Sequence, residues 1–154
     1  MVLLNSILAY LSAACAGIFT GAMLTEALVL VPLWRSLRPT EFSALHARHA
    51  RLLYGFFAPL TAITTTVMVL SGGMALAVGH AQSYLAVTAS ALSMAILCIY
   101  FLYFRHANAA LASQLGRPEA LEPLLAQWAV WHRRRTAISM VAFLFSLLFL
   151  MCEK

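Results

Sequence analysis

Four long stretches without a charged side chain dominate this sequence of 154 residues. They cover residues 1–25, 52–79, 81–104 and 136–152. A helix needs about 20 mostly apolar residues to cross the hydrocarbon core of a bilayer, so the first three stretches are long enough. The fourth has 17 residues and is at the lower limit, which indicates that its helix begins earlier in the chain. The sequence therefore predicts an all-α integral membrane protein, a bundle of four spanning helices.

The composition supports this class and limits the number of domains. Hydrophobic residues make up 63% of the chain and charged residues 10%, whereas a soluble domain is about half apolar and a quarter charged. Four spans leave too few residues for a separate soluble domain, so we expect one domain over residues 1–154. We place the spans at about 3–34, 50–79, 82–106 and 124–151, with the fourth helix starting near Pro123 or Leu124.

The positive charges indicate how the chain is oriented in the membrane. Nine of its ten basic residues lie in the connections between the first and second and between the third and fourth spans. They are Arg35, Arg38, Arg48, Arg51, Arg105, Arg117, Arg133, Arg134 and Arg135. The positive-inside rule then places both connections in the cytoplasm and both termini outside, in a prokaryotic plasma membrane. Because topology accounts for the net charge of +5, we expect the lipid bilayer and not nucleic acid as a partner.

Polar side chains gather at the same membrane face. Glu26 lies within the first span, nine residues or about 13 Å of helix before Arg35. A carboxylate at that depth is costly unless it faces the bundle and has a partner. We expect a functional role for Glu26, the alternative being a structural ion pair with Arg135 or a histidine. His46 and His49 are three residues apart and share one face of the second helix, which we expect to begin at Thr40.

The third and fourth helices bring further polar groups to this layer. Asn108 follows the third span, and Trp128, His132 and Arg135 form one stripe at spacings of four and three residues. Four of the five histidines therefore lie at one level. Other charged residues are more typical of interface anchors or solvated side chains. They are Arg48, Arg51, Arg105, His106, Arg133 and Arg134.

These donors suggest three cofactor states. Glu26, His46, His49 and His132 together would suit a single metal ion such as copper, iron or zinc, because neutral imidazole favours these metals. A ferritin-like di-iron site needs about four carboxylates, and this layer offers only Glu26 and Glu41. Haem held between histidines of two helices is the second state. The third is a site without any cofactor, and the sequence does not choose among them.

Three segments carry a resemblance to a known family. They are GIFTGAMLTEALVLVPLWRSL at 17–37, FRHANAALA at 104–112 and WAVWHRRRTA at 128–137. With the polar start of the second helix, they resemble the anthrone-oxygenase-like family of small four-span membrane proteins, over nearly the whole chain. The resemblance implies a reaction that introduces oxygen into an anthrone to give an anthraquinone. It also implicates particular residues, namely Glu26, Pro32, Asn108, Trp128, His132 and Arg135.

The leading functional hypothesis is an oxygenase-like membrane oxidoreductase whose small lipophilic substrate enters from the bilayer. Glu26 and the histidines would bind metal or move protons. Asn108 would hydrogen-bond the substrate or a ligand, and Arg135 would stabilise developing negative charge. Without a metal, Glu26 or His132 would remove a proton from an activated aromatic carbon, and the resulting carbanion would reduce oxygen directly.

The alternative hypothesis is a small transporter or a non-enzymatic membrane subunit whose polar layer serves packing or proton movement. A transporter of this size would have to assemble as a homo-oligomer, and the sequence leaves that state open. Polarity continues across the membrane only as hydroxyl groups, which commonly bond to their own backbone. They are Thr61, Thr64, Thr65, Thr66, Ser71, Thr136, Ser139 and Ser146. A polar site closed at one end favours an enzyme over a pore.

Overall fold

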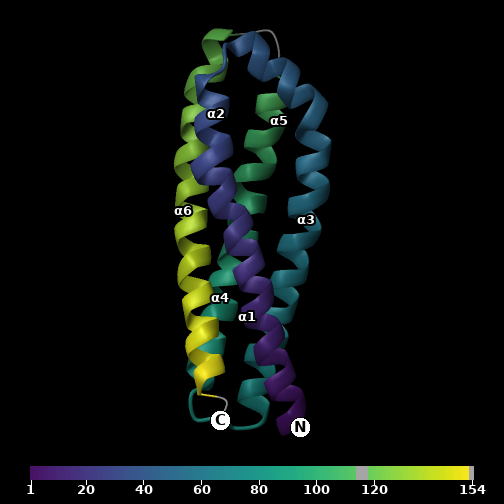
Figure 1. Ribbon diagram of the computed structural model, residues 1–154, viewed down its shortest axis with the longest axis vertical. Helices are drawn as coiled ribbons and strands as arrows, with labels where there is room; N and C mark the ends of the chain where they lie inside the picture. The colour runs from purple at the N-terminus through teal and green to yellow at the C-terminus, as the bar shows by residue number, and fades with distance from the viewer. Residues whose placement is uncertain (114–117, 153–154) are drawn as a thin grey trace.

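The computed structural model describes residues 1–113 and 118–152, and every regular element in these ranges is helical (Figure 1). The α-helices are α1 (Val2–Thr25), α2 (Val31–Ser36), α3 (Pro39–Ala77), α4 (Ser83–Ile99), α5 (Arg105–Ser113) and α6 (Pro118–Met151). Two π-helical segments, η1 (Glu26–Leu30) and η2 (Tyr100–Phe104), join α1 to α2 and α4 to α5. The chain thus forms four long helical columns.

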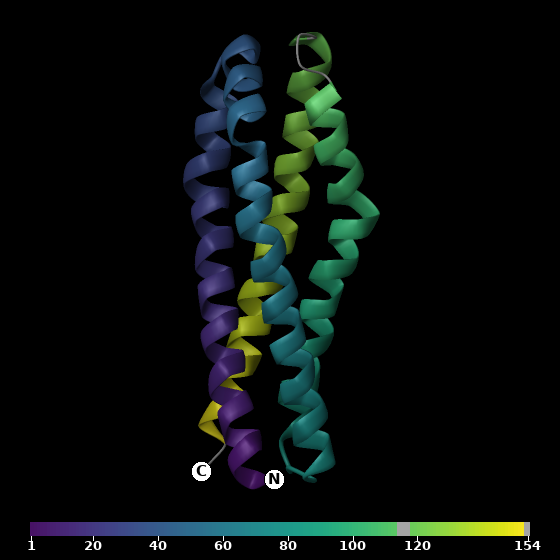
Figure 2. The same cartoon turned by 90° about the vertical axis from the view of Figure 1, so that its right-hand side faces the viewer.

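These columns confirm the predicted all-α fold. Each contains a helix long and apolar enough to cross a membrane, over Val2–Ser36, Pro39–Ala77, Ser83–Ser113 and Glu119–Met151. The architecture is compatible with an integral membrane protein. The start of α1 and the end of α6 lie together at one end of the bundle, and the α2–α3 connection, the end of α5 and the start of α6 lie at the other, which we call the basic end (Figures 1 and 2).

The second column begins one residue before the expected start at Thr40. Helix α3 begins at Pro39, whose fixed φ suits the first helical position and whose missing N–H would be unpaired there. Glu41 secures this start, because its Oε2 accepts the Arg38 backbone N–H at 3.0 Å. Its Oε1 accepts a hydrogen bond from the Arg38 guanidinium at 2.6 Å. The Glu41 carboxylate raises the pKa of Arg38 above its ordinary value.

Two other helix ends differ from the sequence prediction. Helix α6 begins at Pro118, not near Pro123, and runs through that proline. Strong helix formers in EALEPLLAQ (119–127) extend the helix to this point. The third column continues as α5 to Ser113, beyond the predicted end at residue 106. Both columns therefore reach further toward the basic end than their apolar cores indicate.

Hydroxyl groups link the helices in the half of the bundle nearer the termini. Thr65 and Ser93 share a hydrogen bond of 2.9 Å between α3 and α4. Thr20 on α1 donates to the Ser139 carbonyl on α6 at 3.1 Å. The expectation that hydroxyls bond to their own backbone holds for Thr61 on α3 and for Thr136, Ser139 and Ser146 on α6. It was wrong for Thr64 and Thr65, which bond to α1 and α4. Part of this polarity therefore links neighbouring helices.

Close packing of α3 on α4 predicts a specific effect on stability. A Cβ atom at Gly72 would lie 2.5 Å from Ser90 Oγ and 3.2 Å from the Ala86 carbonyl oxygen. The Ser90 hydroxyl cannot easily move, because it donates to carbonyl oxygens of Met68 and Ala86. We expect Gly72→Ala to lower the free energy of unfolding by about 1–3 kcal/mol, the usual cost of overpacking. Denaturant unfolding in detergent micelles, followed by circular dichroism, measures this change.

The neighbouring glycine is the matched control. A Cβ atom at Gly73 has no heavy atom within 4 Å, so Gly73→Ala changes only the helix propensity. That change stabilises a helix by up to about 1 kcal/mol. Equal stability of the Gly72→Ala and Gly73→Ala variants would contradict the close contact between α3 and α4.

Candidate functional site: a buried carboxylate at an apolar cavity

A cavity of about 750 Å³ lies in the half of the bundle nearer the basic end. We call it the main cavity. Its walls come from α3, from η2 with α5, from α6, and from η1 with α2. Eight aromatic side chains line it: Trp34, Phe42, Tyr54, Phe57, Tyr100, Phe101, Phe104 and Trp128. The main cavity is therefore a largely apolar space of the size that holds a drug-sized molecule.

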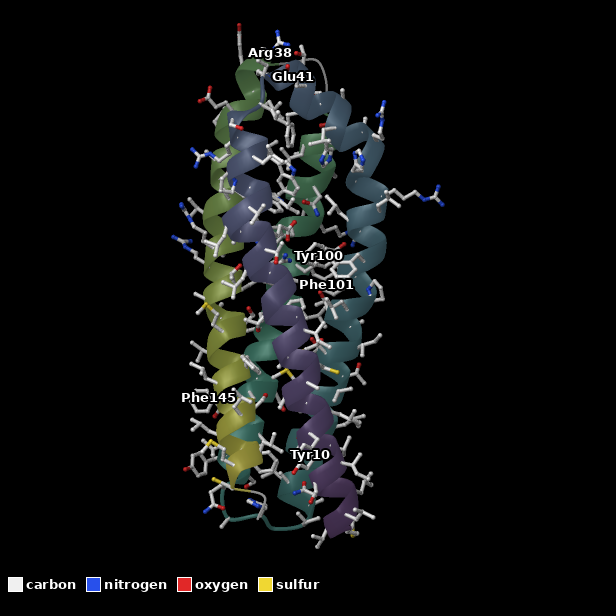
Figure 3. All side chains as sticks on the ribbon, in the orientation of Figure 1. Tyr10, Arg38, Glu41, Tyr100, Phe101 and Phe145 are labelled. Atoms are coloured by element: carbon white, nitrogen blue, oxygen red, sulfur yellow. The ribbon has the colours of Figure 1, made fainter. Side chains whose placement is uncertain are left out.

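The main cavity opens sideways between α3 and the η2–α5 column. Tyr54 on α3 and Phe101, Arg105 and Ala109 on the facing column all line it and are exposed. Figure 2 shows α3 and α5 diverging toward this end of the bundle. In Figure 3, Tyr100 and Phe101 project from η2 toward α3. In a membrane, an opening on the side of the bundle faces lipid.

Glu26, the first residue of η1, lies at the wall of the main cavity. Its side chain is 5% exposed, and of the residues that the structure describes it is the one carboxylate lining this space. Within that part of the chain its Oε2 atom has no hydrogen-bond partner and lies 3.6 Å from His132 Nε2. Arg135 also lines the cavity and interacts electrostatically with Glu26. Carboxylate and guanidinium thus face the same apolar space.

The surroundings of Arg135 hold a buried cation. The residue is 8% exposed, and its guanidinium carbon lies 4.2 Å from the centre of the Phe104 ring. Its NH2 group donates to Met23 Sδ at 3.5 Å. A cation over an aromatic face is attracted by the ring's quadrupole, more strongly where water is excluded. The charge of Glu26 and the Phe104 ring together offset the cost of burying this cation.

His132 is fully buried beside this pair. The Trp128 ring stacks on its ring, with centroids 5.0 Å apart and planes 12° apart. His132 Nε2 lies 3.3 Å from the Met23 carbonyl oxygen, which can only accept, so this contact favours the tautomer with the proton on Nε2. The predicted stripe is confirmed as a spatial arrangement, because Trp128, His132 and Arg135 are all buried on the inner face of α6.

Asn108 joins this arrangement from α5. The Trp128 indole N–H donates to Asn108 Oδ1 at 2.8 Å. This bond fixes the orientation of the amide, and its NH2 group keeps its donors for another partner at the cavity wall. Asn108 is thus placed to bind an oxygen atom of a molecule in the main cavity.

The predicted four-ligand metal site is not assembled. Across residues 1–113 and 118–152, no group of three or more His, Cys, Asp or Glu residues is close enough to hold a metal ion. Glu26 and His132 are neighbours, but His46 lies on the α3 wall and stacks on Phe42 at 5.5 Å. The cause is geometric, because α3 and α6 form different walls of the cavity.

The other proposed ligands do not complete a site either. His49 does not line the main cavity, and its Nδ1 lies 3.0 Å from the Leu45 carbonyl of its own helix. Haem between two helices does not fit these residues, since His132 Nε2 already faces the Met23 carbonyl. Of the four residues proposed as ligands, the described structure brings together Glu26 and His132.

Several residues of the site carry no clear sequence signal. Phe104 appears in the sequence only as the end of an apolar stretch, yet it lies against Arg135. The hydroxyl groups of Tyr54 and Tyr100 interact from α3 and η2, a pairing that no local pattern shows. Met23 precedes Glu26 by three residues, and this spacing is the signal that places both on one helix face.

The fold and the site together define a class. The chain is a membrane-compatible four-helix bundle with an apolar side cavity, a buried carboxylate, and a cation and an amide beside it. Comparison with protein-family models, with curated proteins and with solved structures gives no match. Fold class alone does not determine function, so the functional interpretation is argued from the site.

Proposed function

We propose that the protein is an oxygenase-like membrane oxidoreductase that acts on a small lipophilic molecule with an acidic C–H group. One observation carries this proposal: Glu26 faces an apolar cavity of about 750 Å³ with Arg135 beside it. A buried carboxylate facing a ligand-sized space is suited to act as a general base. The family resemblance of residues 17–37, 104–112 and 128–137 points to the same chemistry, on an anthrone.

The proposed membrane setting explains how a lipophilic molecule reaches Glu26. In this proposal the end of the bundle with the basic residues lies in the cytoplasm and both termini lie outside, as the positive-inside rule predicts. The opening between α3 and α5 then faces the lipid of the inner leaflet. A molecule dissolved in the bilayer can then enter the main cavity sideways without crossing water. On α3, no residue after Ala62 in the chain lines this cavity, so it does not extend toward the opposite end of the bundle. A site confined to one half of the bundle favours an enzyme over a pore.

The residues of the main cavity support a complete reaction. The Glu26 carboxylate takes a proton from an activated CH2 group, and Arg135 stabilises the negative charge left on the substrate. The Asn108 NH2 group donates to a substrate oxygen. The carbanion gives an electron pair to dioxygen, and the Glu26 proton completes a hydroperoxide, which loses water to leave a carbonyl. Overall, one CH2 group and O2 give one C=O group and one water.

Turnover of anthrone by protein in lipid nanodiscs tests this proposal. We expect saturable oxygen uptake and anthraquinone formation above the spontaneous rate. The variant Ala109→Trp places a large side chain at an exposed position in the cavity opening. It should lower kcat/KM by roughly tenfold, which corresponds to about 1.4 kcal/mol of activation free energy. The control is Ala47→Trp, at an exposed position of α3 outside the cavity lining. Product formation no faster than in empty nanodiscs would reject the proposal. Equal values of kcat/KM for the Ala109→Trp and Ala47→Trp variants would reject it as well.

A further inference from the structure

A second, smaller space lies on another side of Glu26. This cleft of about 360 Å³ is bordered by η1 and α2 on one side and by α6 on the other, and we call it the α2–α6 cleft. Arg35, Ser36 and Arg133 line it and are exposed, whereas His132 lines it and is fully buried. The α2–α6 cleft therefore leads from exposed charged side chains to the buried His132.

Glu26 and His132 divide the two spaces between them. Glu26 lines the main cavity and not the cleft, and His132 lines the cleft and not the main cavity. Their facing atoms, Glu26 Oε2 and His132 Nε2, are 3.6 Å apart. A shift of a few tenths of an ångström brings them to the 2.6–3.2 Å range in which a proton moves between heavy atoms. The pair thus lies between a lipid-facing space and a cleft that has Arg35, Ser36 and Arg133 along its exposed edge.

This arrangement solves a problem that a buried base creates. Glu26 acts as a base only when it is ionised. The proposed reaction returns its proton to the product, so a Glu26 carboxyl group that is protonated before the first turnover must lose its proton to water by another route. The main cavity is lined mostly by apolar and aromatic side chains and, in the proposed membrane setting, opens toward lipid, so it is a poor route for water. We infer that His132 carries protons between Glu26 and the α2–α6 cleft. The catalytic meaning of this relay rests on the proposed function, but the relay itself does not.

The transfer balances at the imidazole ring. Toward Glu26, the Nε2–H bond breaks as an O–H bond forms at Glu26 Oε2, and Nδ1 gains a proton that enters through the cleft. In reverse, Nε2 takes the carboxyl proton and Nδ1 releases its own. In the described structure Nδ1 is buried without a hydrogen-bond partner, so no other described group of the protein occupies this nitrogen. Neutral imidazole carries one proton in either tautomer, so each step leaves the ring uncharged.

The groups around His132 favour rapid transfer of a proton through the imidazole ring over a long-lived protonated imidazolium. Trp128 stacking and the Met23 carbonyl hold the ring in place. The charged groups near it are Glu26 from η1, Arg135 from its own helix, and Arg35 and Arg133 in the cleft. Three of these four are cations, which disfavour a lasting imidazolium. A proton therefore crosses the ring without remaining on it.

Time-resolved infrared spectroscopy after a pH jump tests the relay without any substrate. The readout is the carbonyl stretch of the protonated Glu26 carboxyl group in nanodiscs, assigned by its loss in Glu26→Gln. We expect His132→Gln to slow the approach to the new equilibrium about tenfold or more. Glutamine keeps an N–H donor for the Met23 carbonyl but does not exchange protons. His106→Gln, at an exposed histidine outside both spaces, should relax at the native rate.

A second variant leaves His132 intact. Ser36→Cys modified with a bulky maleimide fills the mouth of the α2–α6 cleft, and we expect the same slowing. The control is the native chain treated with the same reagent, because Cys98 and Cys152 are also exposed. Native rates in either His132→Gln or the modified Ser36→Cys protein would overturn the relay. If both variants exchange protons more slowly than the native protein, but the native protein does not oxidise anthrone, the relay is supported and the proposed reaction is rejected.

Discussion

Replacing Glu26 with glutamine is expected to lower kcat by about 10²- to 10⁴-fold, the usual contribution of a positioned general base. Glutamine matches glutamate in size, so the main cavity keeps its shape, but its amide takes up no proton. Because the substrate is held mainly by the aromatic walls, we expect KM to change little. Oxygen uptake over a range of anthrone concentrations separates the two constants.

Glu41→Gln is the matched control for this experiment. Glu41 is an exposed carboxylate at the start of α3, where it pairs with Arg38 outside the main cavity. The same chemical change there should leave kcat at the native value. If Glu26→Gln keeps native turnover, or if Glu41→Gln loses as much, Glu26 is not the base.

The second large effect concerns stability. Arg135→Met is expected to lower the free energy of unfolding by about 3–5 kcal/mol, because it leaves the Glu26 charge buried without a compensating cation. Adding Glu26→Gln to this variant should restore much of the loss, since no uncompensated charge then remains. Denaturant unfolding of the two single variants and the double variant gives the coupling free energy between the residues.

Arg134→Met is the control that shows how much stability is lost when an exposed arginine is replaced by methionine. The Arg134 guanidinium also lies over an aromatic ring, 5.0 Å from the centre of Trp131, but the residue is exposed. A cation–π contact at an exposed site is worth about 0.5–1 kcal/mol, so this variant should be nearly as stable as the native protein. A double variant no more stable than Arg135→Met would show that the charges of Glu26 and Arg135 do not compensate each other.

The sequence predicted the four helices because the bilayer imposes a simple rule on length and charge. Uncharged stretches of about 20 residues have few other uses in a chain this short, and the structure has helices at all four. The stripe of Trp128, His132 and Arg135 was also predictable, since one straight α-helix carries all three and helical periodicity fixes their shared face.

The assembly of the site was less predictable because it depends on distances between helices. His46 and His49 lie at the same level as Glu26, but level alone does not say that a wide cavity separates α3 from α6. The contact between Arg135 and Phe104 joins two helical columns. It depends on how each column is rotated about its own axis, which the local sequence pattern does not indicate. Levels and faces were therefore predictable, and the contacts between columns were not.

Both π-helical segments border the main cavity, and this makes the site depend on chain length as well as on side chains. A π turn accommodates one more residue than an α turn. If the same residues 26–30 formed an ordinary α turn instead, the extra residue would rotate α2 by about 100° relative to α1. Trp34 would leave the cavity wall, although every side chain of the site was retained. The spacing of the chain along η1 and η2 is thus part of the site, to the same degree as Glu26 itself.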